Sequence, residues 1–194
     1  MKQPTRAALL SIAAFVATTA LAALKAGDAA PPFTAPASLA GQPFTYSLKE
    51  SLAKGPVVVY FYPSAYTSGC NVQAHEFSTK TEQFAAAGAS VVGVSLDSIE
   101  RLNAFSADHT YCAGKLAVAS DAEGRIARSF GLRVTDAQPG AIDTRGKEID
   151  HGFAERTTFV VRKDGTIAAI VGGVSPSENV ARALEQVKML AASR

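Results

Sequence analysis

Residues 57–70 read VVVYFYPSAYTSGC, which we interpret as a strand, a turn and the start of a helix. The first six residues are β-branched or aromatic, as in a buried strand, and Pro56 and Pro63 act as breakers on either side. Beyond the turn, apolar or small side chains recur at positions 72, 74, 77, 84 and 85, the spacing of one buried helical stripe. We therefore predict a strand at 57–62 and a long helix from Thr67 to about residue 87.

Cys70 lies in the first turn of this predicted helix, where Thr67 or Ser68 can serve as the N-cap. The backbone N–H groups of a first helical turn lack acceptors within the helix, and they carry the positive end of the helix dipole. Both effects favour a thiolate over a thiol. We therefore interpret Cys70 as a reactive cysteine. The alternative is a small buried core residue, the usual role of a free cysteine.

The length and composition indicate one domain. At 194 residues with 47% hydrophobic composition, the chain can bury one sizeable core. Charged residues make up only 19% of the sequence and the formal net charge is +2, without the clustered Lys/Arg face of a nucleic-acid-binding protein. We therefore expect no nucleic-acid partner.

The N-terminus carries the pattern of a secretory signal peptide. A basic start precedes an uncharged stretch, residues 7–24, and Ala20-Leu21-Ala22 offers a cleavage site. We expect a signal peptide at 1–22, a single domain at 23–194, and a periplasmic or secreted protein with no stable membrane association after cleavage. The alternative is an uncleaved anchor, since a spanning helix needs about 20 apolar residues.

The remaining pattern completes an α/β domain. The strand at 57–62, the long helix and a second apolar strand at 90–96 form a βαβ unit, which implies parallel pairing. The turn Asp164-Gly165 marks an antiparallel hairpin. We predict further strands at 116–119, 157–161 and 166–171. We predict helices from residue 99 to near Cys112, at 122–130 with Asp121 as the cap, and at 175–191. A long loop is expected at 134–154, and an extended, proline-punctuated lead-in at 29–36. This order is the thioredoxin-like arrangement, a mixed central sheet with helices on both faces.

The spacing Pro63-x-x-x-Thr67-x-x-Cys70 after an aromatic strand, followed by Glu76-Phe77 and by Arg156-Thr157-Thr158-Phe159, resembles the peroxiredoxin family. The bacterioferritin-comigratory-protein branch is the most similar. The resemblance runs from residue 27 to the hairpin at 163–165. Because it combines four fixed positions with a strand-turn-helix context, it is far more specific than a lone cysteine.

The resemblance implies a thiol-dependent peroxidase without a cofactor. Cys70 would attack the terminal oxygen of hydrogen peroxide or an organic hydroperoxide and become a sulfenic acid. Thr67 would place its hydroxyl near the thiolate and the peroxide, Pro63 would shield the site from water, and Arg156 would stabilise the thiolate and the developing charge. A thioredoxin-like protein or a low-molecular-weight thiol would be the reductant, and the enzyme would be a monomer or homodimer. Glu76 either braces an arginine or pairs with Lys80 on the helix surface.

One position departs from the branch. Many members carry a resolving cysteine five positions after the first, and here that position is His75. Other peroxiredoxins place a resolving cysteine on the second helix, where we expect Cys112. The resemblance therefore implies a disulfide between Cys70 and Cys112. The alternative is a one-cysteine enzyme that is reduced by an external thiol.

The sequence lacks the residues that other functions of thioredoxin-like proteins require. A disulfide oxidoreductase needs Cys-x-x-Cys, but Thr67 stands three positions before Cys70. A copper-handling protein would need Cys-x-x-x-Cys, and the two possible positions are Tyr66 and Ala74. The histidines at 75, 109 and 151 match no common zinc or copper spacing, so we expect no metal site. A non-catalytic binding module is the remaining alternative.

Overall fold

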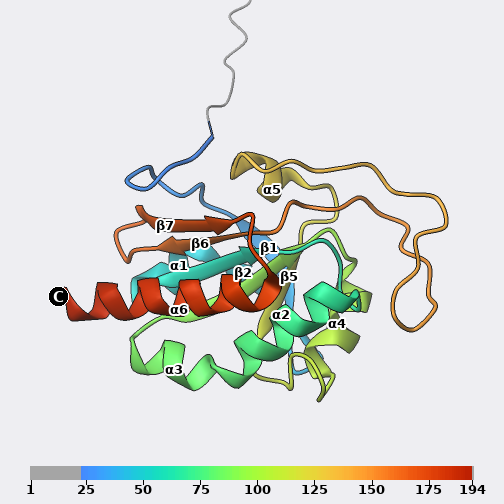
Figure 1. The fold of residues 1–194 in the computed structure, drawn as a ribbon, viewed down its shortest axis with the longest axis horizontal. Coiled ribbons are helices and arrows are strands. Elements are labelled where there is room, and N and C mark those ends of the chain that lie inside the picture. The colour runs from blue at the N-terminus through green and yellow to red at the C-terminus, as the bar shows by residue number, and fades with distance from the viewer. Residues whose placement is uncertain (1–22, 194) are drawn as a thin grey trace, which may run out of the picture.

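The computed structural model describes residues 23–193, so the predicted signal peptide at 1–22 lies outside the described residues. The strands are β1 (Thr34–Leu39), β2 (Gln42–Ser47), β3 (Val57–Phe61), β4 (Ser90–Ser95), β5 (Ala117–Ser120), β6 (Thr157–Val161) and β7 (Ile167–Gly172). They form one mixed sheet in the order β2-β1-β5-β4-β3-β6-β7 (Figure 1). Strand β4 lies parallel to β3 and β5, whereas the other neighbours pair antiparallel.

Helices cover both faces of the sheet, as predicted. They are α1 (Leu48–Lys54), α2 (Ser68–Thr79), α3 (Thr81–Ala86), α4 (Ile99–Ala107), α5 (Arg125–Ser129) and α6 (Pro176–Ala192). Alternate side chains of a strand point to opposite faces, so β3 contributes to two hydrophobic cores. Val58 and Tyr60 pack with α2, α3, α4 and α6, whereas Val57 and Val59 pack with α1 and α5. Within residues 23–193, no helix has the length and apolar character to cross a bilayer.

The N-terminal lead-in is extended, as predicted, but its end is also paired. Residues 34–47 form the β1–β2 hairpin, which was not predicted, and α1 follows directly. Strand β1 pairs with β5 only at Ala37 and Ser38, so Pro36 lies beyond that ladder. Pro43 lies on β2, which is an edge strand, where sheets tolerate proline. The prolines therefore restrict where this hairpin can pair but do not prevent it.

The long helix predicted over 67–87 is instead two helices, α2 and α3, separated at Lys80. Side-chain hydroxyls near the break donate to carbonyls one turn back: Ser78 to His75 at 2.8 Å, Thr79 to Glu76 at 3.1 Å, and Thr81 to Ser78 at 2.9 Å. Such bonds compete with the backbone ladder and bend or end helices. The break lets α2 pack against α6 while α3 packs against β4 and α6.

Helix α4 ends earlier than predicted. It stops at Ala107, and residues 109–115 form turns in which Ala113 and Gly114 have φ of 52° and 67°. The Asp108 carboxylate accepts from Thr110 N at 2.9 Å, and the Asp108 carbonyl accepts from Ala113 N at 2.8 Å. This local bonding is an alternative to the helical ladder. Cys112 therefore lies in an irregular segment and not on the helix.

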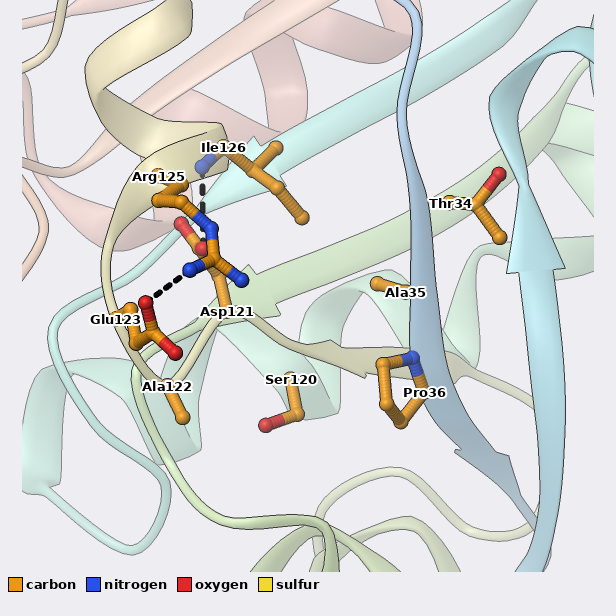
Figure 2. A pocket seen from close by; sticks show the side chains of 9 residues that line it. All are labelled: Thr34, Ala35, Pro36, Ser120, Asp121, Ala122, Glu123, Arg125 and Ile126. Atoms are coloured by element: carbon orange, nitrogen blue, oxygen red, sulfur yellow. Dashed lines mark hydrogen bonds and ion pairs between the residues drawn. The ribbon is translucent and has the colours of Figure 1, made fainter.

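Helix α5 is shorter than the predicted 122–130, and its N-cap is Gly124 and not Asp121, although the Asp121 carboxylate still bonds its first turn. The Asp121 carboxylate accepts from the backbone nitrogens of Ile126 at 3.0 Å and Ala127 at 2.8 Å. Burial raises the pKa of Asp121, against the opposing effect of these donors. Figure 2 shows this carboxylate in a surface pocket between β1 and α5, where Arg125 pairs with Glu123. None of the residues that line this pocket belongs to the predicted site.

Candidate active site

Cys70 lies just beyond the carboxyl end of β3. The chain leaves β3 at Phe61, turns through residues 62–67 with Pro63 half-buried, and enters α2, so Cys70 is in the first helical turn as predicted. The Cys70 side chain is 1% exposed. Thr67 occupies the N-cap position, but its hydroxyl donates to the Ser64 carbonyl at 2.9 Å instead of capping the helix. The first N–H groups of α2 thus lack that cap beside the thiol.

Arg156 reaches Cys70 from the neighbouring strand. It immediately precedes β6, and Thr157 lies opposite Phe61 in the antiparallel β3–β6 pair, which places Arg156 beside the turn. Its Nη2 donates to Cys70 Sγ at 3.3 Å, and its Nη1 donates to Gln73 Oε1. One guanidinium therefore contacts both the thiol and the helix that carries it.

Two buried amides lie behind this guanidinium. Gln73 Nε2 donates to Asn179 Oδ1 at 2.9 Å, and Asn179 Nδ2 donates to the Val171 carbonyl at 2.9 Å. Gln73 and Asn179 are both 0% exposed, so they depend on partners within the protein. Arg156 is thereby joined to α6 and β7.

Gly69 leaves room for the guanidinium. A Cβ at this position would lie 3.2 Å from Arg156 Nη2 and 3.4 Å from Pro176 Cγ. We expect Gly69→Ala to slow the reaction of Cys70 with hydrogen peroxide about three- to tenfold by displacing Arg156, a loss of roughly 1 kcal/mol. The free energy of unfolding should not fall, because alanine favours a helix by up to about 1 kcal/mol over glycine.

Ser68→Ala is the matched control for this prediction, since Ser68 is exposed in the same helical turn. Stopped-flow rates and urea unfolding would be measured on both variants. Equal rates for the two would mean that Arg156 does not need the space beside Gly69.

A buried carboxylate holds the turn in front of Cys70. Asp97 follows β4 at the same edge of the sheet and is 0% exposed. Its oxygens accept from Ser64 Oγ at 2.8 Å, from Ala65 N at 2.7 Å and from Ser95 Oγ at 2.7 Å. Because these bonds join the turn to β4, they fix the backbone that leads into α2.

Two arginines extend this cluster to the loop at 134–154. Arg101 Nε lies 2.9 Å from Asp97 Oδ1, and its Nη2 lies 2.8 Å from Asp143 Oδ2 and donates to the Ala65 carbonyl at 2.9 Å. Burial opposes ionisation of Asp143, but hydrogen bonds led by that from Arg145 lower its pKa to about 2. Asp97, Arg101, Asp143 and Arg145 therefore form a charge cluster that ties the loop to the turn.

Within the turn, the loop at 134–154 contacts Tyr66. Its φ is 62°, a left-handed conformation that is uncommon for a bulky residue. Its carbonyl accepts from Thr144 N at 2.9 Å and Thr144 Oγ1 at 2.7 Å, and the Arg145 guanidinium carbon lies 3.1 Å from its ring centroid. Tertiary contacts thus hold the strained backbone next to the reactive helix.

His151 completes the charge cluster as a cation. Its Nε2 bonds to Asp97 Oδ1 at 2.9 Å and its Nδ1 to the Gly152 carbonyl at 2.8 Å; both partners only accept, so both ring nitrogens donate. Burial lowers the His151 pKa, but the bond to Asp97 and its charge outweigh burial, and the net pKa lies above 6.5. Burial likewise opposes ionisation of Asp97, yet bonds from His151 and Ser95 hold its pKa below 3.8.

We therefore expect the free energy of unfolding to decrease as the pH rises above 6.5. The folded state binds the His151 proton more tightly than the unfolded state does, so this contribution is complete below 6.5 and is lost as the pH passes the folded pKa. Asp97 acts at the acid end, where its contribution is lost as the pH falls below 3.8. Urea unfolding of wild type, His151→Gln and the control His109→Gln from about pH 6 to 9 checks this. An equal pH slope in all three would contradict it.

Cys112 packs in the same hydrophobic core as Cys70. Both thiols are free, and Cys112 is 0% exposed. Burial, with a smaller contribution from the charge of Asp108, raises the pKa of Cys112. His75 Nδ1 bonds to the Thr110 carbonyl at 2.8 Å, and the single Ser78 hydroxyl proton is shared between the His75 carbonyl and the Tyr111 carbonyl, the latter at 2.7 Å. The segment that carries Cys112 therefore lies directly against α2.

The structure brings together most of the predicted site residues and adds others to them. Pro63 and Thr67 lie in the turn before Cys70, and Arg156 contacts the thiol, whereas Cys112 lies in a separate turn. Of the two alternatives for Glu76, the structure shows the helix-surface pair, with Lys80 at 2.9 Å. The supporting residues Gln73, Asp97 and Asn179 were not predicted. The sequence does offer a signal for each of them: Asp97 directly follows a buried strand, and Gln73 and Asn179 are single amides beside the apolar stripes of helices.

Comparison with known proteins decides the family. The model described as the AhpC/TSA family matches residues 26–170. The chain belongs to this family. Peroxiredoxin Bcp of Escherichia coli (strain K12) is 32% identical over 144 residues, which cover 74% of this chain and 83% of that protein. The resemblance to peroxiredoxins of the bacterioferritin-comigratory-protein branch is therefore confirmed.

Solved structures of peroxiredoxins share the fold. Peroxidoxin BcpB from Mycobacterium tuberculosis has a TM-score of 0.70 and 28% identity, covering 86% of this chain and 98% of that one. The bacterioferritin comigratory protein of Xanthomonas campestris, whose structures were used to study its alkyl peroxide reduction, has a TM-score of 0.63 and 26% identity, covering 80% and 91%. The thioredoxin-like fold is confirmed, and the protein is a thiol-dependent peroxidase with a peroxide substrate and a thiol reductant.

Proposed function

We propose that Cys70 is the peroxidatic cysteine of this peroxidase. Its thiolate attacks the terminal oxygen of a hydroperoxide ROOH, so that an S–O bond forms as the O–O bond breaks. Cys70 becomes a sulfenic acid, and the leaving RO⁻ takes up a proton to become an alcohol, or water when R is hydrogen. The observation that carries this proposal is the 3.3 Å contact between Arg156 Nη2 and Cys70 Sγ, a cation held at a buried thiol.

The groups around Cys70 fit the charge changes of this step. The Arg156 guanidinium stabilises the thiolate and then the negative charge on the leaving oxygen, together with the free N–H groups of the first turn of α2. The Thr67 hydroxyl proton is directed to Ser64, which leaves its lone pairs to accept the O–H of a hydroperoxide. Pro63, half-buried in the turn, limits access of water. Hydrogen peroxide and organic hydroperoxides both present the required O–OH group.

Cys112 is the proposed resolving cysteine. Its sulfur attacks the Cys70 sulfenic sulfur, a disulfide forms and water leaves; two external thiols then reduce the disulfide. A disulfide requires Cα atoms within about 7 Å, and we expect the approach of the two cysteines to unwind the first turn of α2 and to move the turn at 109–115. Because Cys112 is outside helix α4, only α2 has to lose helical structure. Exposure to water also removes the burial that raises the Cys112 pKa.

The setting of the enzyme is proposed from its N-terminal sequence. We place the mature protein, residues 23–194, in the periplasm or outside the cell, as a monomer or homodimer without stable membrane association. A thioredoxin-like protein or a low-molecular-weight thiol of that compartment would be the reductant. N-terminal sequencing of protein from cells checks this placement, since an intact Met1 would contradict cleavage.

One equivalent of hydrogen peroxide tests the cysteine assignments. Intact mass and free-thiol counts would be taken on the reduced wild type and on the Cys70→Ser and Cys112→Ser variants. Loss of two hydrogens and of both thiols, only when both cysteines are present, supports resolution by Cys112. One oxygen gained on Cys70 with Cys112 still free would instead establish the one-cysteine cycle. A wild type that stays unchanged would contradict the role of Cys70.

A further inference from the structure

We propose that Asn179 is a positioning residue for peroxide reduction: it sets the orientation of the Gln73 amide, and through it the Arg156 guanidinium that faces Cys70. The proposal rests on the roles given above to Cys70 and Arg156. Asn179 lies on α6, far along the chain from the nucleophile, and it does not contact the reacting atoms itself.

Asn179 is a fully buried polar residue on the side of α6 that packs against the sheet. Helix α6 packs on the sheet through Val180, Ala183, Leu184 and Val187, and Asn179 beside this stripe is 0% exposed. A buried amide without partners is unfavourable, and here each polar end of the side chain has one. Nδ2 donates to the Val171 carbonyl at 2.9 Å, and Oδ1 accepts from Gln73 Nε2 at 2.9 Å and from Thr158 Oγ1 at 2.5 Å.

The direction of these bonds leaves one arrangement. The Val171 carbonyl can only accept, so the NH₂ of Asn179 must face β7 and its oxygen must face Gln73. The Gln73 NH₂ must then face Asn179, which turns Gln73 Oε1 toward Arg156. Arg156 can only donate; Nη1 is bound by that oxygen and Nη2 is left to bond Cys70 Sγ at 3.3 Å.

A wrongly turned Gln73 would disrupt this arrangement. Its NH₂ would then face the Arg156 guanidinium, donor against donor, and the guanidinium would be driven from the thiol. Without the oxygen of Asn179, the Arg156 guanidinium alone would select between the two orientations of Gln73, and only while it stays bonded to Gln73 Oε1. Helix α6, through Asn179, therefore affects the attack of Cys70 on the peroxide by excluding the wrong orientation of Gln73.

The test is a double-mutant cycle between positions 73 and 179, in the Cys112→Ser background so that Cys70 is the only thiol. With Gln73 present, Asn179→Leu should slow the reaction of Cys70 with hydrogen peroxide about tenfold, the effect of partly losing a hydrogen bond to a charged group. Gln73→Glu alone should also be slow, because its carboxylate faces the Asn179 oxygen. Adding Asn179→Leu to Gln73→Glu should speed the reaction at least about threefold, since a carboxylate accepts from Arg156 in either orientation.

Asn179→Asp is the conservative variant, because it keeps an oxygen toward Gln73. Its rate should stay within about threefold of wild type even if it is less stable. Thr158→Val removes the second donor to Asn179 Oδ1 but leaves the bond from Gln73 to that oxygen, so it is the control for lost stability and should behave likewise. Each rate would be measured at a temperature where urea unfolding shows the variant to be folded.

The outcomes separate this proposal from the assigned peroxidase chemistry. If Asn179→Leu slows Cys70 equally with Gln73 and with Glu at position 73, or if Asn179→Asp is as slow as Asn179→Leu, Asn179 has only a structural role and the proposal fails. Iodoacetamide alkylation of Cys70 is measured in parallel, because it needs the thiolate but no peroxide. In alkylation, too, Asn179→Leu should slow the reaction when residue 73 is glutamine and speed it when residue 73 is glutamate. This reversal would support the positioning role even if hydrogen peroxide did not react with any of the proteins.

Discussion

Replacing Arg156 by methionine is expected to lower the rate constant for the reaction of Cys70 with hydrogen peroxide by about 10²–10³-fold, as loss of one preorganised donor does in other enzymes. Thiolate formation alone cannot account for so large a contribution. A free cysteine is already a few per cent thiolate at neutral pH, so complete ionisation gains at most about thirtyfold. The rest must come from stabilising the breaking O–O bond, and Arg156 is the cation bonded to Cys70 Sγ.

Two further arginine variants give this prediction its controls, with stopped-flow kinetics as the measurement. Arg156→Lys keeps the charge but not the planar guanidinium that bonds both Cys70 and Gln73. Its rate constant should therefore exceed that of Arg156→Met by less than about tenfold. Arg182→Met removes an exposed arginine of α6 and should stay within about twofold of wild type. An Arg156→Met rate close to that of Arg182→Met would remove Arg156 from the mechanism.

Replacing Asp97 by asparagine is expected to lower the free energy of unfolding by about 3–5 kcal/mol, the usual effect of removing one partner from a buried charge cluster. Asp97 accepts on both oxygens, from Ala65 N and Ser95 Oγ on one and from Ser64 Oγ and His151 on the other. Either orientation of an amide would turn its NH₂ toward donors. The side chain of Arg101 would also lose its anionic partner at 2.9 Å.

Urea unfolding of Asp97→Asn and of Asp136→Asn provides the comparison. Asp136 is exposed, so its replacement should change the free energy of unfolding by less than about 0.5 kcal/mol. Similar midpoints for the two variants would mean that the cluster around Asp97 contributes little net stability, as some buried ion pairs do.

The strand, the turn and the reactive helix could be predicted because their signals are local. The run Val57–Phe61 is apolar throughout, Pro63 ends it, and Cys70 follows at a spacing that a helix start explains. Arg156 was found only through the family resemblance. No local pattern shows that β6 pairs with β3 in the register that places this residue beside the thiol.

The parts that were missed depend on contacts between distant segments. Tyr66 adopts a left-handed φ although a turn of this kind favours glycine or asparagine, and it is held there by Thr144 and Arg145 from the long loop. The amphipathic pattern of α6 predicts a buried stripe but not that Asn179 would bond Gln73. The break at Lys80 depends on hydroxyl groups whose direction is set only in the folded protein.

The place of Arg156 and Asn179 in the chain has a consequence during translation. Cys70 leaves the ribosome well before the β6 arginine and the last helix, and N-terminal segments generally begin to fold first. A nascent chain thus carries its cysteine without the guanidinium that faces it in the finished protein. The thiol of an unfinished chain is therefore expected to react with peroxide as slowly as an ordinary cysteine, until the C-terminal strands and α6 dock.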